Sequence, residues 1–129
     1  MMGLQARYAP GRLIGQSMRS FSEPDRAIMA HPEVQWAFVA MGGEATRSGS
    51  RGAQHDMALM TSPWDFRPQD VSIPVNLWQG EEDTAASPAM ALYLTEVIPD
   101  SEARFYAGEG HISLIVNHTE KILSVLAER

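Results

Sequence analysis

Two side chains capable of acid–base chemistry occupy separate loops in the second half of the sequence. Asp83 lies in the turn-rich acidic segment of residues 80–84, and His111 follows the glycine-rich residues 108–110. A carboxylate that accepts an imidazole N–H fixes the tautomer of the ring and stabilises the imidazolium formed during proton transfer. If the two loops are neighbours, Asp83 and His111 supply the orienting half of a nucleophile–base–acid relay.

The segments before these two loops have the patterns of β-strands. Apolar residues alternate with mainly polar ones over residues 71–79, which is strand periodicity, and residues 103–107 form a second short strand. Between them, Ser87 and Pro88 begin a helix that Pro99 ends.

A final helix, which Asn117 caps together with Glu120, follows the second strand. The order strand, helix, strand, helix over residues 71–127 predicts a βαβα unit with two parallel strands and a right-handed crossover. Ligands bind outside the carboxyl ends of such strands. The loops that carry Asp83 and His111 therefore belong at one edge of the sheet.

The first half of the chain has helical signals. We divide the chain into two parts, a helical part of residues 1–62 and a second part of residues 63–129. Residues 22–25 have the form of a capping box, and the helix that follows ends at His31 because Pro32 disfavours helix in the residue before it. Pro32 begins a second helix, which the glycine pair at residues 42–43 stops. A third helix spans residues 53–60, with its two methionines facing inward.

Composition excludes several classes of protein. The 129 residues are 44% hydrophobic and 20% charged, which is typical of a globular chain. The net charge of −6, with Lys121 as the only lysine, leaves no basic stripe for nucleic acid. No apolar run reaches the roughly 18 residues of a membrane span, and we expect no secretory signal because the first residues lack an apolar h-region. The absence of cysteine excludes disulfides and thiolate catalysis. We expect a cytoplasmic protein that acts on small molecules.

Simpler interpretations exist for each of these residues. An aspartate after a strand is common for turn chemistry alone, and a histidine after glycine is often a surface or hydrogen-bonded residue. A metal site is an alternative, but no short-range ligand spacing supports it, and we expect neither a metal nor another cofactor. The side chains that could contribute to such a site are His55, Asp56, Glu81, Glu82 and His118.

Three stretches of sequence resemble the C-terminal part of α/β-hydrolase-fold proteins: residues 63–66, residues 70–83 and residues 108–113. In that family a strand of the form I-x-x-P-V followed by G-x-x-D delivers the catalytic acid, and a later G-x-G-H loop delivers the catalytic histidine. The resemblance covers about residues 48–127. It implies a partial α/β-hydrolase fold, with Asp83 as acid, His111 as base and the helical N-terminal part as a cap.

The family's nucleophile and oxyanion hole have no counterpart in this sequence. Residues 48–52 come nearest to the G-x-S-x-G elbow, but the first glycine and the preceding strand are missing. A two-stranded parallel sheet is also not independently stable. We therefore expect the C-terminal half of a serine hydrolase for an ester or similar small substrate, inactive alone. It would self-associate, or pair with a missing N-terminal half, through an open strand edge. The alternatives are a non-catalytic binding or assembly module derived from a hydrolase, and a small α/β protein whose likeness is accidental.

Overall fold

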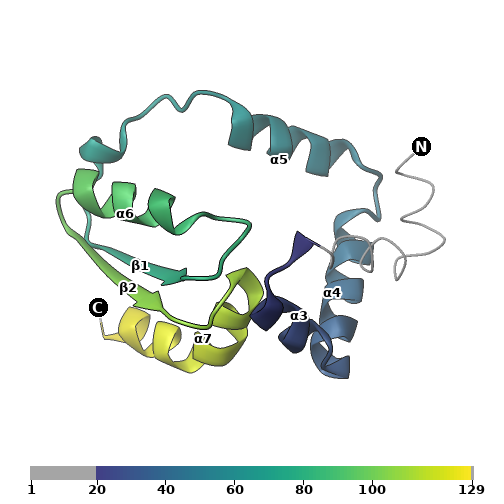
Figure 1. The fold of residues 1–129 in the computed structure, drawn as a ribbon. Helices are drawn as coiled ribbons and strands as arrows, with labels where there is room; N and C mark the ends of the chain where they lie inside the picture. The colour runs from purple at the N-terminus through teal and green to yellow at the C-terminus, as the bar shows by residue number, and fades with distance from the viewer. Residues whose placement is uncertain (1–19, 129) are drawn as a thin grey trace. The chain divides into compact units, whose positions relative to one another are not determined.

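The computed structural model describes residues 20–128, which form a mixed α/β structure with five α-helices and a two-stranded parallel sheet (Figure 1). The described chain divides into two compact units. One contains residues 29–65, and the other contains residues 21–28 together with residues 66–128. The short helix α3 (Glu23–Met29) begins in the second unit, although the sequence grouped residues 22–25 with the N-terminal helices.

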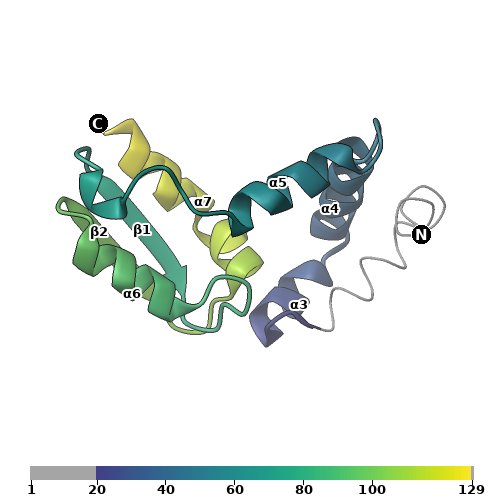
Figure 2. The same ribbon diagram turned by 90° about the horizontal axis from the view of Figure 1, so that it is seen from above.

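The second unit is built on the parallel strands β1 (Val75–Gly80) and β2 (Ser101–Tyr106), paired along their whole length. Helix α6 (Pro88–Val97) covers one face of this sheet and α7 (His111–Ala127) covers the other, as Figures 1 and 2 show from two sides. The strand–helix–strand–helix order and the parallel pairing predicted from the sequence are both observed. They bring the two loops that follow β1 and β2 to the same edge of the sheet.

Strand β1 begins four residues later than the alternation of side chains predicts. Residues Pro68–Asp70 form a 3₁₀ turn, and Pro74 has no N–H to donate to a ladder. The first bond between the strands runs from the Val75 N–H to the Asp100 carbonyl oxygen, at 2.8 Å. The apolar residues before Pro74 therefore lie outside the sheet, and Ile73 is exposed.

Helix α7 begins at His111, six residues before the predicted start at Asn117. The prediction was wrong because it relied on the Asn117 side chain, which is typical of an N-cap. The N-cap residue of α7 in the structure is Gly110, which has no side chain. The Asn117 side chain instead donates to the Glu109 carboxylate, at 3.1 and 3.2 Å. The N–H groups of the first turn of α7 are bonded by a distant residue, described below.

The first unit contains α4 (Pro32–Ala45) and α5 (Arg51–Thr61). The glycine pair at residues 42–43 does not stop α4, which continues to Ala45, so that prediction was wrong. A glycine inside a helix costs only about 1 kcal/mol, so the helix can continue past the pair and end at the Thr46 C-cap. The prediction for α5 was wrong in another respect, because Met57 and Met60 are exposed and neither helix contains a buried residue.

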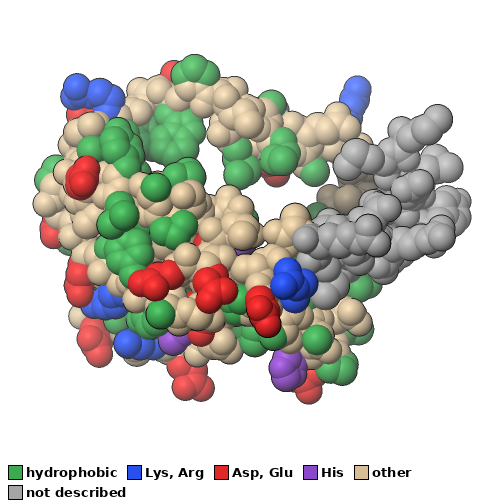
Figure 3. Space-filling model, viewed as in Figure 1, with side chains coloured by type: hydrophobic (Ala, Val, Ile, Leu, Met, Phe, Trp, Pro, Cys, Tyr) green, Lys and Arg blue, Asp and Glu red, His purple; other side chains and the backbone are tan. Residues whose placement is uncertain are grey.

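The second unit has a small apolar core beside large exposed apolar surfaces. Its buried hydrophobic residues are Ala91, Ile98, Ile112 and Leu114. Both covering helices also carry large apolar side chains that remain exposed: Met90, Leu92 and Tyr93 on α6, and Ile115, Val116, Leu123 and Leu126 on α7. Figure 3 shows hydrophobic side chains gathered on the surface over α6. Large apolar side chains on both covering helices of this unit are thus left without cover in the described chain.

Candidate active site

Asp83 is held in place by the turn that follows β1. Its Oδ1 atom accepts hydrogen bonds from the N–H groups of Ala85 and Ala86, at 2.7 and 2.8 Å. These bonds are those of an Asx turn, in which the aspartate side chain replaces a backbone acceptor. They orient the carboxylate and leave its second oxygen, Oδ2, free to bond elsewhere. The side chain of Asp83 is 5% exposed.

The second oxygen of Asp83 meets the imidazole of His111. The distance from Asp83 Oδ2 to His111 Nδ1 is 2.9 Å, across 28 residues of sequence. An ionised carboxylate can only accept, so the bond requires a proton on Nδ1, and the neutral ring then has its lone pair on Nε2. The His111 side chain is 50% exposed. The two residues predicted to form an acid–base pair are therefore in contact, and half of the histidine side chain remains exposed.

Close packing of backbone joins the two loops that carry this pair. The Glu82 N–H donates to the Glu109 carbonyl oxygen, at 2.9 Å. Gly80, the last residue of β1, lies against the same peptide, and a Cβ atom there would overlap the carbonyl groups of Glu109 and Gly110. A residue without a side chain is therefore needed at the end of β1. This contact fixes the spacing of the loops, and hence the spacing of Asp83 and His111.

Asp25 of α3 caps the helix that begins with His111. One carboxylate oxygen accepts from the Ile112 and Ser113 N–H groups, at 2.8 and 3.0 Å, and the other from the His111 N–H, at 3.0 Å. Burial works to raise the pKa of Asp25, but the backbone hydrogen bonds from Ser113, Ile112 and His111 outweigh it and lower that pKa. Residue Gly110 cannot cap α7, and a carboxylate 86 residues earlier in the chain does so instead.

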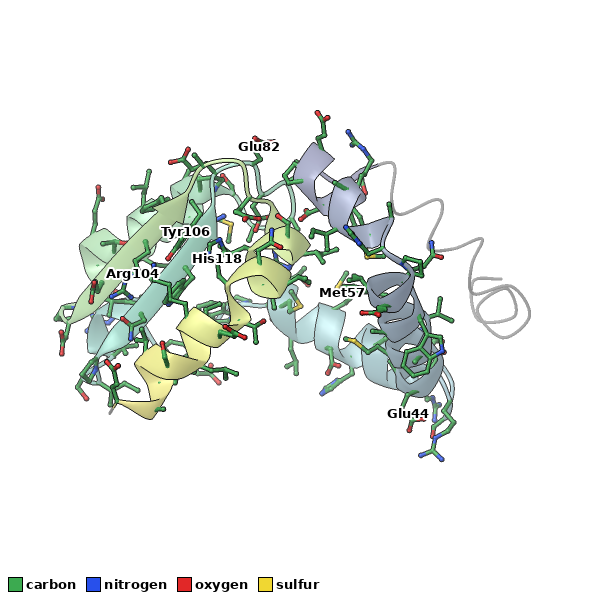
Figure 4. All side chains as sticks on the ribbon, turned by 90° about the horizontal axis from the view of Figure 1, so that it is seen from below. Glu44, Met57, Glu82, Arg104, Tyr106 and His118 are labelled. Carbon is green, nitrogen blue, oxygen red and sulfur yellow. The ribbon has the colours of Figure 1, made fainter. Side chains whose placement is uncertain are left out.

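A second carboxylate–histidine pair lies between β2 and α7. Glu109 Oε1 is 3.2 Å from His118 Nε2, and the His118 ring packs on Tyr106 at 4.3 Å between ring centroids. Figure 4 shows His118 on α7 pointing toward Tyr106, with Arg104 on the same strand. Burial works to raise the pKa of Glu109, but hydrogen bonds from Ser113, Asn117 and His118, with the charge of His118, lower it. This pair fastens α7 and the loop before it to the sheet.

The sequence did not predict either of these two arrangements. The long separation of Asp25 from α7 leaves no local pattern, and residues 22–25 have an adequate local explanation as the start of α3. One signal was available: a glycine just before a helix leaves several N–H groups without a local acceptor. Such a helix start indicates that another part of the chain supplies the cap.

The serine nearest to His111 in the sequence is buried and not available as a nucleophile. Ser113, two residues away, is fully buried, and its hydroxyl accepts the Gly110 N–H at 2.8 Å. Residues 20–128 also contain no group of three or more potential metal ligands, and the side chains His55 and Asp56 lie on α5, in the other unit. No described helix combines the length and apolar character needed to cross a membrane.

Comparison of this chain with protein-family models, with curated proteins and with solved structures finds no match. The resemblance to α/β-hydrolases therefore stays a prediction from the sequence motifs. What is established is a βαβα unit with a carboxylate–histidine pair at the carboxyl edge of its sheet.

Proposed function

We propose that this chain supplies the acid and the base of a serine-hydrolase site of the α/β-hydrolase type. The observation that carries the proposal is the 2.9 Å contact between Asp83 Oδ2 and His111 Nδ1, on a ring that is half exposed. Both residues follow parallel strands, and the acid precedes the histidine along the chain, as in that family. A cytoplasmic location and a small ester or similar substrate are parts of the same proposal.

The chemistry assigned to the pair is proton transfer at Nε2 of His111. As a serine hydroxyl attacks the substrate carbonyl, Nε2 takes the hydroxyl proton and then delivers it to the departing alkoxide. Water next loses a proton to the same nitrogen as it attacks the acyl-serine, and the serine regains that proton when the acid is released. Asp83 keeps the Nδ1 proton directed toward itself and stabilises the imidazolium at each transfer.

The serine and the oxyanion hole would come from a segment that adds a strand to β1. The N–H groups of Val75 and Glu81 donate to the carbonyl oxygens of Asp100 and Tyr106. In a parallel pair the N–H groups of successive residues point alternately to the two edges of a strand, so those of odd-numbered residues of β1 point toward β2. The N–H groups of Asn76 and Trp78 therefore point to the other edge of β1, where the described chain has no further strand. Such an edge is a ready template for another strand.

The exposed apolar side chains of α6 and α7 favour the same proposal. They lie on the two helices that cover the sheet, so a longer sheet with further helices would bury them. They also favour the second candidate, a non-catalytic assembly module derived from a hydrolase, because self-association would cover them equally well. Enzyme activity distinguishes these two candidates, since both predict association through this region.

The test is turnover of a chromogenic ester by the purified chain, alone and mixed with a segment that carries a G-x-S-x-G elbow encoded upstream of it. The chain alone should be inactive, and the mixture should be active. In the mixture, His111→Ala should reduce kcat by about 10⁴-fold or more, as removal of a relay member does. The control is His55→Ala, an exposed residue of α5, which should leave kcat unchanged. A mixture that associates but does not turn over ester supports the assembly module, and full activity with His111→Ala overturns the proposal.

A further inference from the structure

His111 is the first residue of α7, which places its ring at the positive end of a helix dipole. The N-terminus of a helix behaves as a partial positive charge of roughly half an elementary charge. A neutral imidazole tolerates that position, but an imidazolium is disfavoured there by like-charge repulsion. A base in this position would therefore have a low proton affinity, unless another charge offsets the dipole.

Asp25 places a negative charge on the same helix end. Its carboxylate bonds to the N–H groups of the first three residues of α7, so it lies where the partial positive charge of the dipole is concentrated. The residue is 1% exposed, so solvent screens its charge little. The lowered pKa of Asp25 keeps the carboxylate ionised at neutral pH.

We propose that Asp25 is a positioning residue that offsets the positive end of α7 and so allows His111 to accept a proton. The consequence for catalysis rests on the function proposed above, but the effect on His111 itself does not. Two other carboxylates belong to the surroundings of the ring. Asp83 comes from the loop after β1 and bonds to the ring directly. Glu109 precedes α7, but its carboxylate is engaged by Asn117 and His118.

The proposal is tested by titrating the Cε1 proton of His111 in the full chain by NMR. Asp25→Asn removes the charge but keeps a side-chain oxygen that can accept from the first turn. We expect the proton affinity of His111 to fall by about threefold to tenfold, which moves the titration midpoint down by roughly half to one pH unit. The control is Glu23→Gln, which removes an exposed charge from the same helix turn and should leave the midpoint unchanged.

Two further variants keep the test decisive if Asp25→Asn does not fold. Asp25→Ser is a shorter neutral cap, and Asp25→Glu restores the charge. The serine variant should show the lowered midpoint, and the glutamate variant should return it toward that of the unchanged protein. Equal midpoints in folded neutral and charged variants would mean that Asp25 is only a structural cap, and would overturn the proposal. This outcome needs no ester turnover, so it is separate from a failure of the proposed hydrolase function.

Discussion

Replacing Asp25 by alanine should destabilise the second unit strongly, because one side chain bonds three N–H groups at the start of α7. Loss of an ordinary N-cap costs about 0.5–2 kcal/mol, and a hydrogen bond to a charged group contributes about 1.5–3 kcal/mol. Water can enter the vacated space and solvate part of the exposed first turn. We therefore expect a loss of about 2–4 kcal/mol for Asp25→Ala, a large fraction of the stability of a small domain.

The same contact predicts how stability depends on pH. The pKa of Asp25 is lower in the folded chain than the ordinary aspartate value of 3.8, so the ionised carboxylate stabilises the folded state. That contribution is fully present above the unfolded pKa and is lost as pH falls through the folded pKa. The difference in stability between the unchanged protein and Asp25→Asn should therefore be constant near neutral pH and shrink below about 3.8.

Urea unfolding at several pH values measures both effects. With a slope of about 1–3 kcal/mol per molar urea, a loss of about 3 kcal/mol lowers the midpoint by about 1–3 M. Glu23→Gln is again the matched control, since Glu23 lies on the exposed surface of the same helix and should change the midpoint little. Ordinary surface substitutions change the free energy of unfolding by up to about 0.5 kcal/mol. If the free energy of unfolding of Asp25→Ala lay within that range of the unchanged protein, the cap would not support α7 as described.

Three other predictions have defined outcomes. Gly110→Ala should cost about 1–3 kcal/mol because the added Cβ overlaps the side chains of Ser22 and Asp25. Gly42→Ala, with open space around it in α4, should instead stabilise by up to about 1 kcal/mol, and thermal melts compare the two variants. Glu109→Gln should cost about 1 kcal/mol at neutral pH. In urea titrations at acid pH this cost should shrink below the ordinary glutamate pKa of 4.5 and vanish once pH has fallen through the lowered pKa of the folded chain. Asn76→Pro should block addition of a strand to β1, and Ala103→Pro, on the outer edge of β2, should not; co-purification with the upstream segment tests this.

Much of the second unit was predictable from the sequence because its signals are local. Ser87 and Pro88 start α6 as the capping pattern indicates, and the Ser87 hydroxyl accepts the Ala89 N–H. The order of elements predicted parallel strands, and parallel strands predict that Asp83 and His111 lie at one edge. The prediction that the two side chains lie close together came from this topology and not from any local sequence pattern.

The errors came from positions where a contact distant in sequence replaces a local one. The start of α7 was misplaced because Asp25 caps it in place of a neighbouring side chain. The prediction that Met57 faces inward was wrong. A periodic apolar pattern gives a buried helix face only where another element covers that face. In the Glu109–His118 pair, Glu109 lies in the loop before α7 and His118 lies on α7. The sequence alone does not distinguish such a pair from two charged side chains exposed to solvent.

The most direct test of the Asp83–His111 pair is the tautomer of His111, read from its ring ¹⁵N chemical shifts in the full chain at a pH where the ring is neutral. If Asp83 orients the ring, the neutral ring carries its proton on Nδ1, directed at Asp83, with Nε2 unprotonated and available as a base. Asp83→Asn, whose amide can donate to Nδ1, should shift the population toward the Nε2-protonated form. A neutral His111 protonated on Nε2 in the unchanged chain would contradict the assignment of the pair as an acid–base relay.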